Sequence, residues 1–502
     1  MLQPIASASA QRIGAFVVVG LVLWAIVRAA TFLSSEPLLA LANNYDMVRV
    51  QGCIDAYPIR SADVHPAANS YEAPIARYEF RDDVDPGCYF TSEVLFAWAS
   101  LPLIRSAAAR SPDGGFPIRL VGAVKFAAFA LVLVLGAVGI FRRCGPVAAV
   151  ALGAVAVVVL ADPAILLYAH GFYAEFAAFV FLLATMLALA TAGCGEKRAP
   201  LAAWIGALAI VGLTTSKVQH LGLGLAMAVV YFVACRLAGR RDPMTLLLII
   251  VAGLAGVVVQ SWHYSSGRTQ AMQRANITHT VLSTLFVVSQ DPYRTAERLG
   301  LPRQCADHAG KNWYTAGLQE NLPCPELYAL SRARLLTLAV TEPGTLLRTY
   351  FGGFLRLRPW IPDGLGVVEG ESLGRLPAAW FTWARQLEEL SRPALLTLLL
   401  APAVLTIGAA LVRRRRPLRA GSTFLLLALA WLPFPMLGAV VFGDGYLDTP
   451  KQGFLIFACV LSFWVALGVV TIYGIARAAS DGMTRAVWAK LDARRSSNRS
   501  TA

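Results

Sequence analysis

The stretch Asn43-Asn44-Tyr45-Asp46-Met47-Val48-Arg49 decides how the chain is organised, because it follows closely on the apolar run 13–33. A helix needs roughly 20 apolar residues to cross the hydrocarbon core of a membrane, and this run supplies them. The polar stretch therefore lies where a first membrane-spanning helix leaves the bilayer, and it places the carboxylate of Asp46 at that exit. The stretch belongs to a long polar segment, 34–116, which we expect on the outer side of the membrane.

Hydrophobic residues make up 57% of the 502 residues and charged residues only 15%, with a mean hydropathy of +0.58. A soluble domain cannot bury that much apolar surface, so the composition indicates an all-α integral membrane protein. We expect about ten transmembrane helices. Their approximate ranges are 13–33, 117–141, 146–168, 176–193, 200–216, 220–237, 244–264, 393–412, 420–441 and 454–476. The first is not expected to be a cleaved signal, since Glu36 and a polar loop follow it.

Clusters of Lys and Arg orient the chain, because cationic loops resist translocation across the membrane. They occur at Arg12, Arg142-Arg143, Lys197-Arg198, Arg236 to Arg241, Arg413 to Arg419, and in the tail from Arg477 to Arg499. Every second connection is thus basic, which predicts that both termini lie in the cytoplasm. The net charge of +14 is a topology signal of this kind and does not indicate nucleic-acid binding.

The spans and connections divide the chain into four parts. They are an N-terminal transmembrane module, 1–264, which holds spans one to seven and the outer loop 34–116; an outer helical cap, 265–392; spans eight to ten, 393–476; and a basic cytoplasmic tail, 477–502. The stretch 92–110 is apolar but short and interrupted by Pro102. Read as a span it would place Arg142-Arg143 outside, so we expect a helix on the outer membrane surface.

Four of the eight cysteines fall in the two large outer regions, Cys53 and Cys88 in the first and Cys305 and Cys324 in the second. Thiols that occur in pairs in an oxidising compartment suggest two disulfides, one in each region. The alternative is that these thiols are buried and unpaired. The remaining cysteines lie on the cytoplasmic side or inside spans, and no cysteine spacing typical of a metal site is present.

Two carboxylates are candidates for acid–base chemistry at the outer face. Asp46 lies just past the first span, with Arg49 one helical turn later, although an Asp–Arg pair solvated at a helix end is an equally good interpretation. Asp55 is a second possible base that could also be merely solvated. Glu175 lies in the tight outer turn 168–176, where an acid is costly unless it is paired, exposed to water or functional.

Groups that could bind the phosphate or another part of the substrate lie in three outer segments. Lys217, Gln219 and His220 share one tight turn, and a lysine there runs against the charge bias of the loops. The last outer loop offers Asp444 and Lys451, and the cap offers Arg356 and Arg358. Snorkelling of Lys217 and simple orientation of the cap helix are the structural alternatives. Nucleotide-binding glycine loops are missing from suitable contexts.

With these residues the chain resembles the GT-C class of membrane glycosyltransferases, and more narrowly the bacterial hexosyltransferases of surface-layer and other cell-surface glycans. The segments that carry the likeness are Asn43-Asn44-Tyr45-Asp46, Thr215 to His220, Ser289-Gln290-Asp291-Pro292 running to Leu299-Gly300-Leu301, and Gly443-Asp444-Gly445-Tyr446 with Lys451. In that class the acid of the first outer loop is a catalytic base or a metal ligand, a role that would pass to Asp46, with Glu175 in support. Asp46 lacks the adjacent acid of many members, which leaves the need for a divalent cation (Mg²⁺ or Mn²⁺) open.

The resemblance implies hexose transfer from a polyprenyl-phosphate donor to a glycan or lipid-linked acceptor, with inversion, on the outer face of the bacterial cytoplasmic (inner) membrane. A first alternative is a polymerase or ligase of the O-antigen type, in which cap arginines such as Arg356 and Arg358 would do the work. A second is a transporter or flippase of lipid-linked sugars, for which the sequence shows no pair of interrupted helices in symmetric positions.

Overall fold

A computed structural model describes most of the chain. The described residues are 8–42, 45–60, 73–84, 87–194, 199–265, 269–358, 361–362, 365–371, 375–412 and 420–499. Asn43 and Asn44, the basic pair Lys197-Arg198 and the basic run 413–419 therefore lie outside the described residues. The side chains of the tail beyond residue 480 are likewise outside them.

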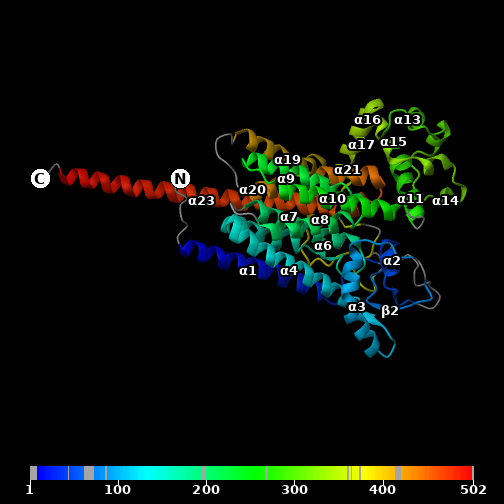
Figure 1. The fold of residues 1–502 in the computed structure, drawn as a ribbon, viewed down its shortest axis with the longest axis horizontal. Coiled ribbons are helices and arrows are strands. Elements are labelled where there is room, and N and C mark those ends of the chain that lie inside the picture. Colours follow the sequence, from blue (N-terminus) through cyan, green and yellow to red (C-terminus); the bar gives the residue numbers. More distant parts are fainter. Residues whose placement is uncertain are drawn as a thin grey trace.

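A bundle of long helices forms the body of the protein (Figure 1). Among the described residues, eight helical segments are long and apolar enough to cross a membrane. They come from α1 (Ala8–Leu33), α4 (Arg119–Cys144), α7 (Ala174–Cys194), η2 (Val218–His220) with α9 (Leu223–Leu237), α10 (Pro243–Tyr264), α19 (Arg392–Val412), α20 (Ala420–Trp431) with α21 (Pro433–Asp444), and α23 (Phe454–Arg499). Two shorter apolar helical segments, Pro146–Leu160 and Pro200–Thr214, take the places of the other two expected spans. The expected multi-pass helical membrane fold is thus confirmed.

The third expected span is shorter than the sequence suggested. The helix over Pro146–Leu160, made of α5 (Pro146–Val155) and the π-helix η1 (Ala156–Leu160), ends well before residue 168. Pro163 has no N–H to continue the helical hydrogen bonds. Asp162 starts a new short helix, α6 (Pro163–Leu166), by accepting a hydrogen bond from the Ala164 amide at 2.8 Å. Buried turns connect α6 to α7, and Glu175 lies in the first turn of α7.

Helix α7 lies at the centre of the bundle, in contact with α4, α8 (Pro200–Thr214) and α20. Close packing here depends on small residues, as is usual between membrane helices. Where α9 crosses α10, for example, a Cβ on Gly224 would lie only 2.7 Å from the Cα of Gly253. The bundle therefore has little freedom to shift one helix past another.

The outer loop 34–116 contains a small sheet that the sequence analysis did not anticipate. Strands β1 (Ala56–Pro58), β2 (Arg77–Phe80) and β3 (Phe116–Pro117) pair antiparallel in the order β1-β2-β3. The same loop holds two helices, α2 (Tyr45–Gln51) and α3 (Glu93–Arg110). Leu95, Trp98 and Leu103 are exposed on α3, which suits a helix lying against a membrane surface.

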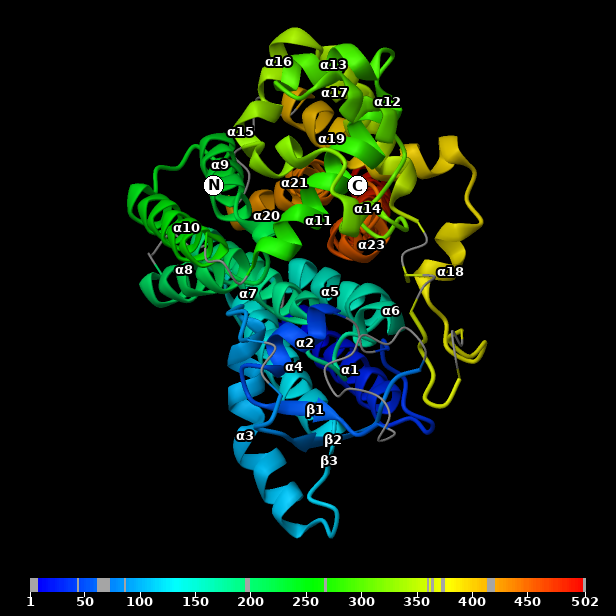
Figure 2. The same cartoon turned by 90° about the vertical axis from the view of Figure 1, so that its right-hand side faces the viewer.

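Residues 270–356 form a helical layer at the end of the bundle where α2 also lies (Figures 1 and 2). Its larger elements are α11 (Gln270–Thr280), the π-helix η4 (Val281–Leu285), α13 (Pro292–Leu299) and α17 (Pro343–Arg356). The smaller ones are α12 (Phe286–Val288), η5 (Arg303–His308), α14 (Leu318–Asn321), η6 (Pro325–Ala329), α15 (Arg332–Leu335) and α16 (Thr337–Thr341). A hydrophobic core of its own, around Leu285, Leu299 and Leu338, holds this layer together.

The last part of the expected cap packs elsewhere. Residues 365–371 pair with the start of the first outer loop, where the Ala40 amide donates to the Val367 carbonyl at 3.2 Å. Beside α18 (Trp383–Glu388), Thr382 donates to Asp162 at 2.7 Å. Figure 2 shows this segment running down the side of the bundle, away from α13 and α17. Hydrophobic residues of the range 265–392 are therefore divided between two cores. The domain boundaries at 265 and 392 stay a prediction.

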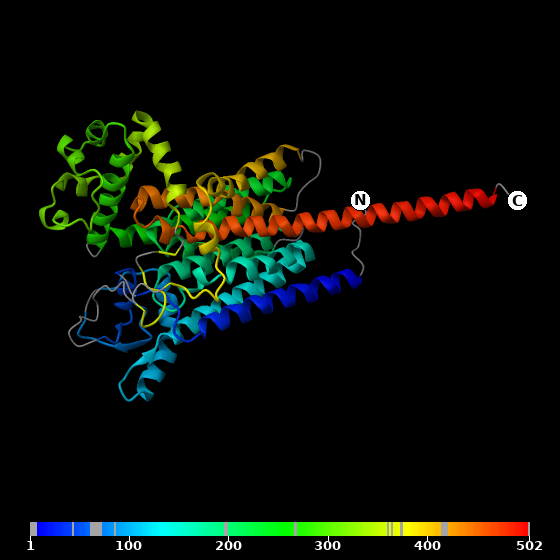
Figure 3. The same ribbon diagram turned by 180° about the vertical axis from the view of Figure 1, so that it is seen from behind.

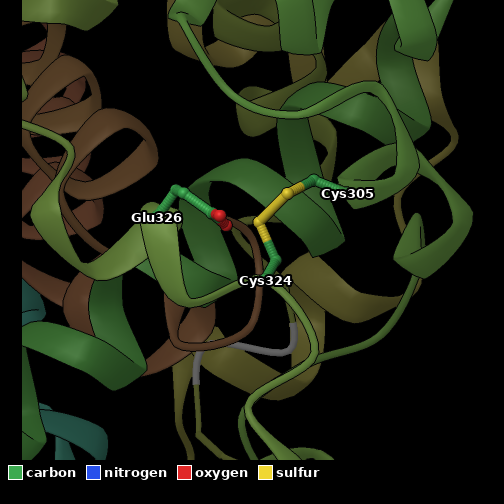
Figure 4. Close-up of side chains that lie close together, drawn as sticks. All are labelled: Cys305, Cys324 and Glu326. Carbon is green, nitrogen blue, oxygen red and sulfur yellow. A yellow bond between two sulfur atoms is a disulfide. The ribbon is translucent and has the colours of Figure 1, made fainter.

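Both expected disulfides are present, Cys53–Cys88 and Cys305–Cys324. Figure 4 shows the second of them, which joins η5 to the start of η6. Cys144, which the sequence placed on the cytoplasmic side, is disulfide-bonded as well.

The start of α1 and the long extension of α23 lie at one end, while α2, the sheet and α11 gather at the other (Figures 1 and 3). The start of α1 and the extension of α23 thus lie at the same end of the bundle, and the expectation that both termini are cytoplasmic stays a prediction.

A fully buried ion pair supports the turn before Glu175. Lys125 on α4 contacts Glu93 at the start of α3, and neither side chain is exposed. Lys125 also donates to the Gly171 carbonyl at 2.6 Å. Removing one partner would leave an uncompensated buried charge, which costs far more than the intact pair contributes.

We expect Glu93→Leu or Lys125→Met alone to destabilise the protein by about 3 kcal/mol, and the double variant to recover most of that loss. Thermal unfolding of the purified protein checks this. The exposed Arg77–Asp113 pair, whose side chains are 48% and 55% exposed, is the matched control; breaking it should cost less than about 1 kcal/mol. A double variant no better than the singles would contradict the account.

Candidate functional site

A cavity of about 650 Å³ opens at the end of the bundle that carries α2 and α11. Its wall is built from segments that are far apart in the sequence. They are α2 in the first outer loop, the turn after α8, α11, and the loop between α21 and α23. The cavity is lined by both charged and aromatic side chains, which is typical of a ligand site with a few well-placed polar groups.

Asp46 lies in this cavity, in the first turn of α2. One of its carboxylate oxygens is 3.2 Å from Arg49, and the other contacts Lys451 and lies 3.5 Å from Lys217. Burial alone would raise the pKa of Asp46. The three cations outweigh burial and hold its pKa well below the usual range. Asp46 is therefore a carboxylate at neutral pH.

Glu175 stands behind Asp46, in the first turn of α7, and is only 1% exposed. Lys217 is 2.7 Å from its carboxylate and Lys451 is 3.9 Å away. Each lysine therefore lies between the two acids. Burial opposes the charge on Lys451, but the acids around it outweigh burial and raise its pKa. The cluster Asp46, Arg49, Glu175, Lys217 and Lys451, here called the charge cluster, carries three positive and two negative groups.

Two tyrosines of the turn before α7 tie the loops of the cluster together. The Tyr173 hydroxyl donates to the Ala42 carbonyl at 2.5 Å, just before α2. The Tyr168 hydroxyl donates to the Lys451 carbonyl at 3.2 Å, on α22 (Thr449–Gln452). Both tyrosines are buried, so these bonds are shielded from water. The first and last outer loops are thereby held against the same turn.

A second group of polar side chains lines another part of the same cavity. Asp444 ends α21, and its carboxylate accepts a hydrogen bond from Gln452 at 2.5 Å. The Nδ1 atom of His279, on α11, is 3.6 Å from the other oxygen of Asp444. With its amide nitrogen turned toward Asp444, Asn276 donates to that oxygen at 2.9 Å. Of these four only Asp444 was singled out from the sequence.

The missed residues left a weak signal in the sequence. Asn276 and His279 interrupt an apolar stretch that would otherwise read as a short span, and polar residues in such a place are expected to be paired or functional. Gln452 gives no comparable signal, because a glutamine next to Lys451 in an outer loop is ordinary. Only the contact with Asp444 shows its place.

Asp448 also lines the cavity. Burial, together with the nearby carboxylates of Asp444 and Asp46, raises its pKa to about 6, with Lys451 acting in the opposite direction. This carboxyl group therefore titrates near neutrality while Asp46 does not.

Not every residue chosen from the sequence reaches the cavity. Gln219 lines it, but His220 is buried and paired with Ser216 at 2.7 Å. Arg356 lies over the ring of Tyr446 at 5.4 Å, and Arg358 donates to backbone carbonyls, including that of Glu388 at 3.2 Å. Neither arginine is among the lining residues. Asp55, the second possible base, is exposed and also outside the lining.

The charge cluster does not fit a divalent cation in this arrangement. The oxygens of Asp46 face two ammonium groups and a guanidinium, which would repel Mg²⁺ or Mn²⁺. Within the described residues, the one group of Cys, His and acidic side chains close enough to share an ion is Cys305, Cys324 and Glu326 (Figure 4). Its two sulfur atoms are joined in a disulfide and are not thiolate ligands.

The fold and the cavity together define a multi-pass helical membrane protein with a buried charge cluster at one end of its bundle. The chain belongs to the family described as the YfdI N-terminal transmembrane domain, whose model matches residues 6–326. The matched range contains Asp46, Glu175 and Lys217, whereas Asp444 and Lys451 lie beyond it.

A search of curated protein sequences gives no match. Among solved structures, the chain is similar to the archaeal oligosaccharyltransferase AglB from Archaeoglobus fulgidus, in complex with an inhibitory peptide and a dolichol-phosphate. The two share 15% identity with a TM-score of 0.40, over 93% of this chain and 52% of AglB. The chain thus spans about half the length of AglB, and a likeness this loose carries no part of the argument below.

We expect Lys451→Met to destabilise the protein by about 3 kcal/mol at pH 7, because Asp46 and Glu175 would lose a shared buried cation. A second change, Asp46→Asn, should restore much of the loss. Since the pKa of Asp46 is depressed in the folded protein, the stability that it contributes is present above about pH 4 and lost as the pH falls further. The penalty of Lys451→Met should shrink in the same range.

Thermal unfolding between pH 3 and pH 8 measures these effects. Lys311→Met, at an exposed lysine of the outer layer, is the control and should stay within about 0.5 kcal/mol of the wild type. A Lys451→Met variant as stable as this control would show that the lysine is not needed to balance the two acids.

Proposed function

We propose that the protein is a membrane glycosyltransferase that moves a hexose from a polyprenyl-phosphate donor to a glycan or lipid-linked acceptor. The observation that carries the proposal is the charge cluster, in which the carboxylate of Asp46 and the ammonium groups of Lys217 and Lys451 face one cavity. Transfer from a sugar phosphate needs a base for the acceptor and cations for the leaving phosphate, and the cluster offers both. The resemblance of the surrounding segments to GT-C glycosyltransferases points the same way.

The charge of the cluster suits such a donor. While Asp448 is protonated, three cations and two carboxylates leave one positive charge, and the phosphodiester of a polyprenyl-phosphate sugar carries one negative charge. Arg49, Lys217 and Lys451 would hold the phosphate oxygens through charge-assisted hydrogen bonds. The lysines would then share their charge between the phosphate and the two acids, so the depression of the Asp46 pKa would lessen and Asp46 would become a better base.

In the proposed step an acceptor hydroxyl oxygen attacks the anomeric carbon. The bond from that carbon to the phosphate oxygen breaks, its electron pair leaves on the phosphate, and the hydroxyl proton passes to Asp46. Glu175 keeps Lys217 and Lys451 in place and does not touch the sugar. Attack in line with the leaving phosphate inverts the anomeric configuration. The products are the lengthened acceptor and polyprenyl phosphate.

The rival functions find less support in the cavity. A polymerase or ligase that uses Arg356 and Arg358 would need both side chains at the reacting groups, whereas these side chains contact Tyr446 and backbone carbonyls. A flippase would need a polar path through the bundle, whereas the polar lining described here lies at one end. The proposed enzyme acts at the outer face of the bacterial inner membrane, with both termini in the cytoplasm.

Asp46→Asn should lower hexose transfer by about 100-fold or more, because the amide cannot accept the acceptor's proton. Purified protein in lipid, given polyprenyl-phosphate hexoses and an acceptor-containing extract, measures this. Asp55→Asn is the matched control. It changes the same residue type in the same loop, outside the cavity, at a positive φ of 53° that asparagine adopts readily. Full activity in a well-folded Asp46→Asn variant would refute the assigned base.

The pKa of Asp448 predicts a pH effect on donor binding. Above about pH 6 this side chain becomes a carboxylate beside Lys451 and opposes an anionic donor. The affinity for a polyprenyl-phosphate hexose should therefore fall roughly threefold from pH 5 to pH 7.5, which is a change of about 0.7 kcal/mol. A sugar phosphodiester does not titrate in this range, so the change reports on the protein.

Asp448→Asn should make the affinity independent of pH across this range, as measured by titration of the protein in lipid discs. His279 lines the same cavity. A pH dependence that survives in Asp448→Asn and vanishes in His279→Asn would assign the effect to the histidine instead.

A further inference from the structure

The polar group formed by Asn276, His279, Asp444 and Gln452 is not used by the proposed reaction step. These residues line the same cavity as Asp46, Lys217 and Lys451, on elements α11, α21 and α22. All four side chains are buried, between 1% and 8% exposed. Polar groups are costly to bury unless they form hydrogen bonds, so the burial of these four side chains needs an explanation.

Two of these side chains have buried polar atoms that form no hydrogen bond within the described residues. Among the described residues, neither ring nitrogen of His279 has a hydrogen-bond partner, since the Asp444 carboxylate at 3.6 Å lies beyond hydrogen-bond distance. In the same described part of the chain, the Oε1 atom of Gln452 accepts no hydrogen bond, although the side-chain nitrogen of Gln452 donates to Asp444. A buried imidazole and a buried amide oxygen with unused hydrogen-bonding capacity could be satisfied by a ligand with several hydroxyl groups.

The backbone holds this group firmly in place. Arg332 donates to the carbonyls of Phe442 and Gly443, at 3.3 and 2.9 Å, and so fixes the end of α21. Gly445 adopts a φ of +71°, and a Cβ at this position would collide with the His279 carbonyl. The π-helix η4 begins directly after Thr280, and such irregular turns are frequent at functional sites. The arrangement is therefore not that of a loose surface loop.

The chemistry of the group matches a sugar more closely than a phosphate. It offers one carboxylate and two amides, which accept and donate hydrogen bonds to hydroxyl groups, and no Lys or Arg side chain. The ring of Tyr314, whose centroid is 5.6 Å from that of His279, also lines the cavity and gives an aromatic surface for the apolar face of a sugar ring. Arg332 lies beside this group, but it donates to backbone carbonyls and does not line the cavity. The cations that line the cavity, Arg49, Lys217 and Lys451, contact Asp46.

We propose that Asn276, His279, Asp444 and Gln452 form a subsite that binds the hydroxyl groups of a hexose beside the charge cluster. The inference rests on the proposed function for its placement, and it adds the residues that recognise the sugar. The hexose is either the sugar of the donor or the terminal sugar of the acceptor. In both cases these side chains bind and select, and they move no proton.

The test uses two variants that keep the volume of the side chain and remove its polar atoms, His279→Phe and Gln452→Met. The full-length protein is placed in lipid discs free of sugar-headed detergent. Binding is measured for polyprenyl phosphate and for its glucose, galactose and mannose diesters. Saturation-transfer NMR measures binding of the three corresponding methyl hexosides. His308→Phe and Gln319→Met, which change the same residue types in the outer layer and outside the cavity lining, are the matched controls.

We expect the two cavity variants to bind polyprenyl phosphate as the wild type does, while the controls behave as the wild type in every measurement. If the subsite holds the donor sugar, the extra affinity of the preferred diester falls about tenfold, the effect of one or two lost hydrogen bonds. If it holds the acceptor sugar, donor affinity stays and the acceptor KM rises about tenfold at nearly constant kcat.

Cavity variants that match the wild type for all diesters, methyl hexosides and the acceptor KM would overturn the subsite. The failure of the proposed function looks different. In that case the wild type binds no polyprenyl-phosphate species, and the subsite still stands if a methyl hexoside shows saturation transfer that His279→Phe abolishes. The absence of saturation transfer from every hexoside in that wild type would overturn both.

Discussion

The sharing of two lysines between two acids is the interaction on which the end of the bundle around α2 and α11 depends. Lys217 and Lys451 each lie between Asp46 and Glu175, in a place where water reaches little of any of them. Buried charges are tolerated only when they are paired and hydrogen-bonded. The residues come from the first outer loop, the start of α7, the turn after α8 and the last loop, so the balance of charge also fixes how four distant segments meet.

The same balance relates the fold to the proposed chemistry. A carboxylate held by three cations is stable but is a poor base, and cations held by carboxylates are ready for another anion. Binding of a phosphodiester would redistribute these charges without unpairing any of them. A site built in this way needs no large movement of the backbone to pass from its resting arrangement to a reacting one.

Interruptions of regular helices place the polar side chains around the cavity. The apolar helix before Asp162 and Pro163 ends early. The residues after it form the buried turn that carries Tyr168 and Tyr173, and Glu175 follows in the first turn of α7. Gly445 lets the end of α21 approach α11, which brings Asp444 beside His279. Backbone outside regular helices is acceptable at such depths only where protein groups satisfy it, as the tyrosine hydroxyls and Arg332 do here.

The sequence by itself determined the helical membrane class, the places of the ten apolar helical segments and both outer disulfides, because hydropathy and compartment act locally along the chain. It also selected Asp46, Glu175, Lys217 and Lys451 one at a time, as charges in outer turns. Only the tertiary structure decided that these four meet, that Arg356 and Arg358 lie outside the cavity, and that His279, Asn276 and Gln452 line it. The small sheet, the short third span and the bonded Cys144 were also missed. Which loops come together depends on how helices pack side by side, and that packing arises from contacts between residues hundreds of positions apart, which no local pattern records.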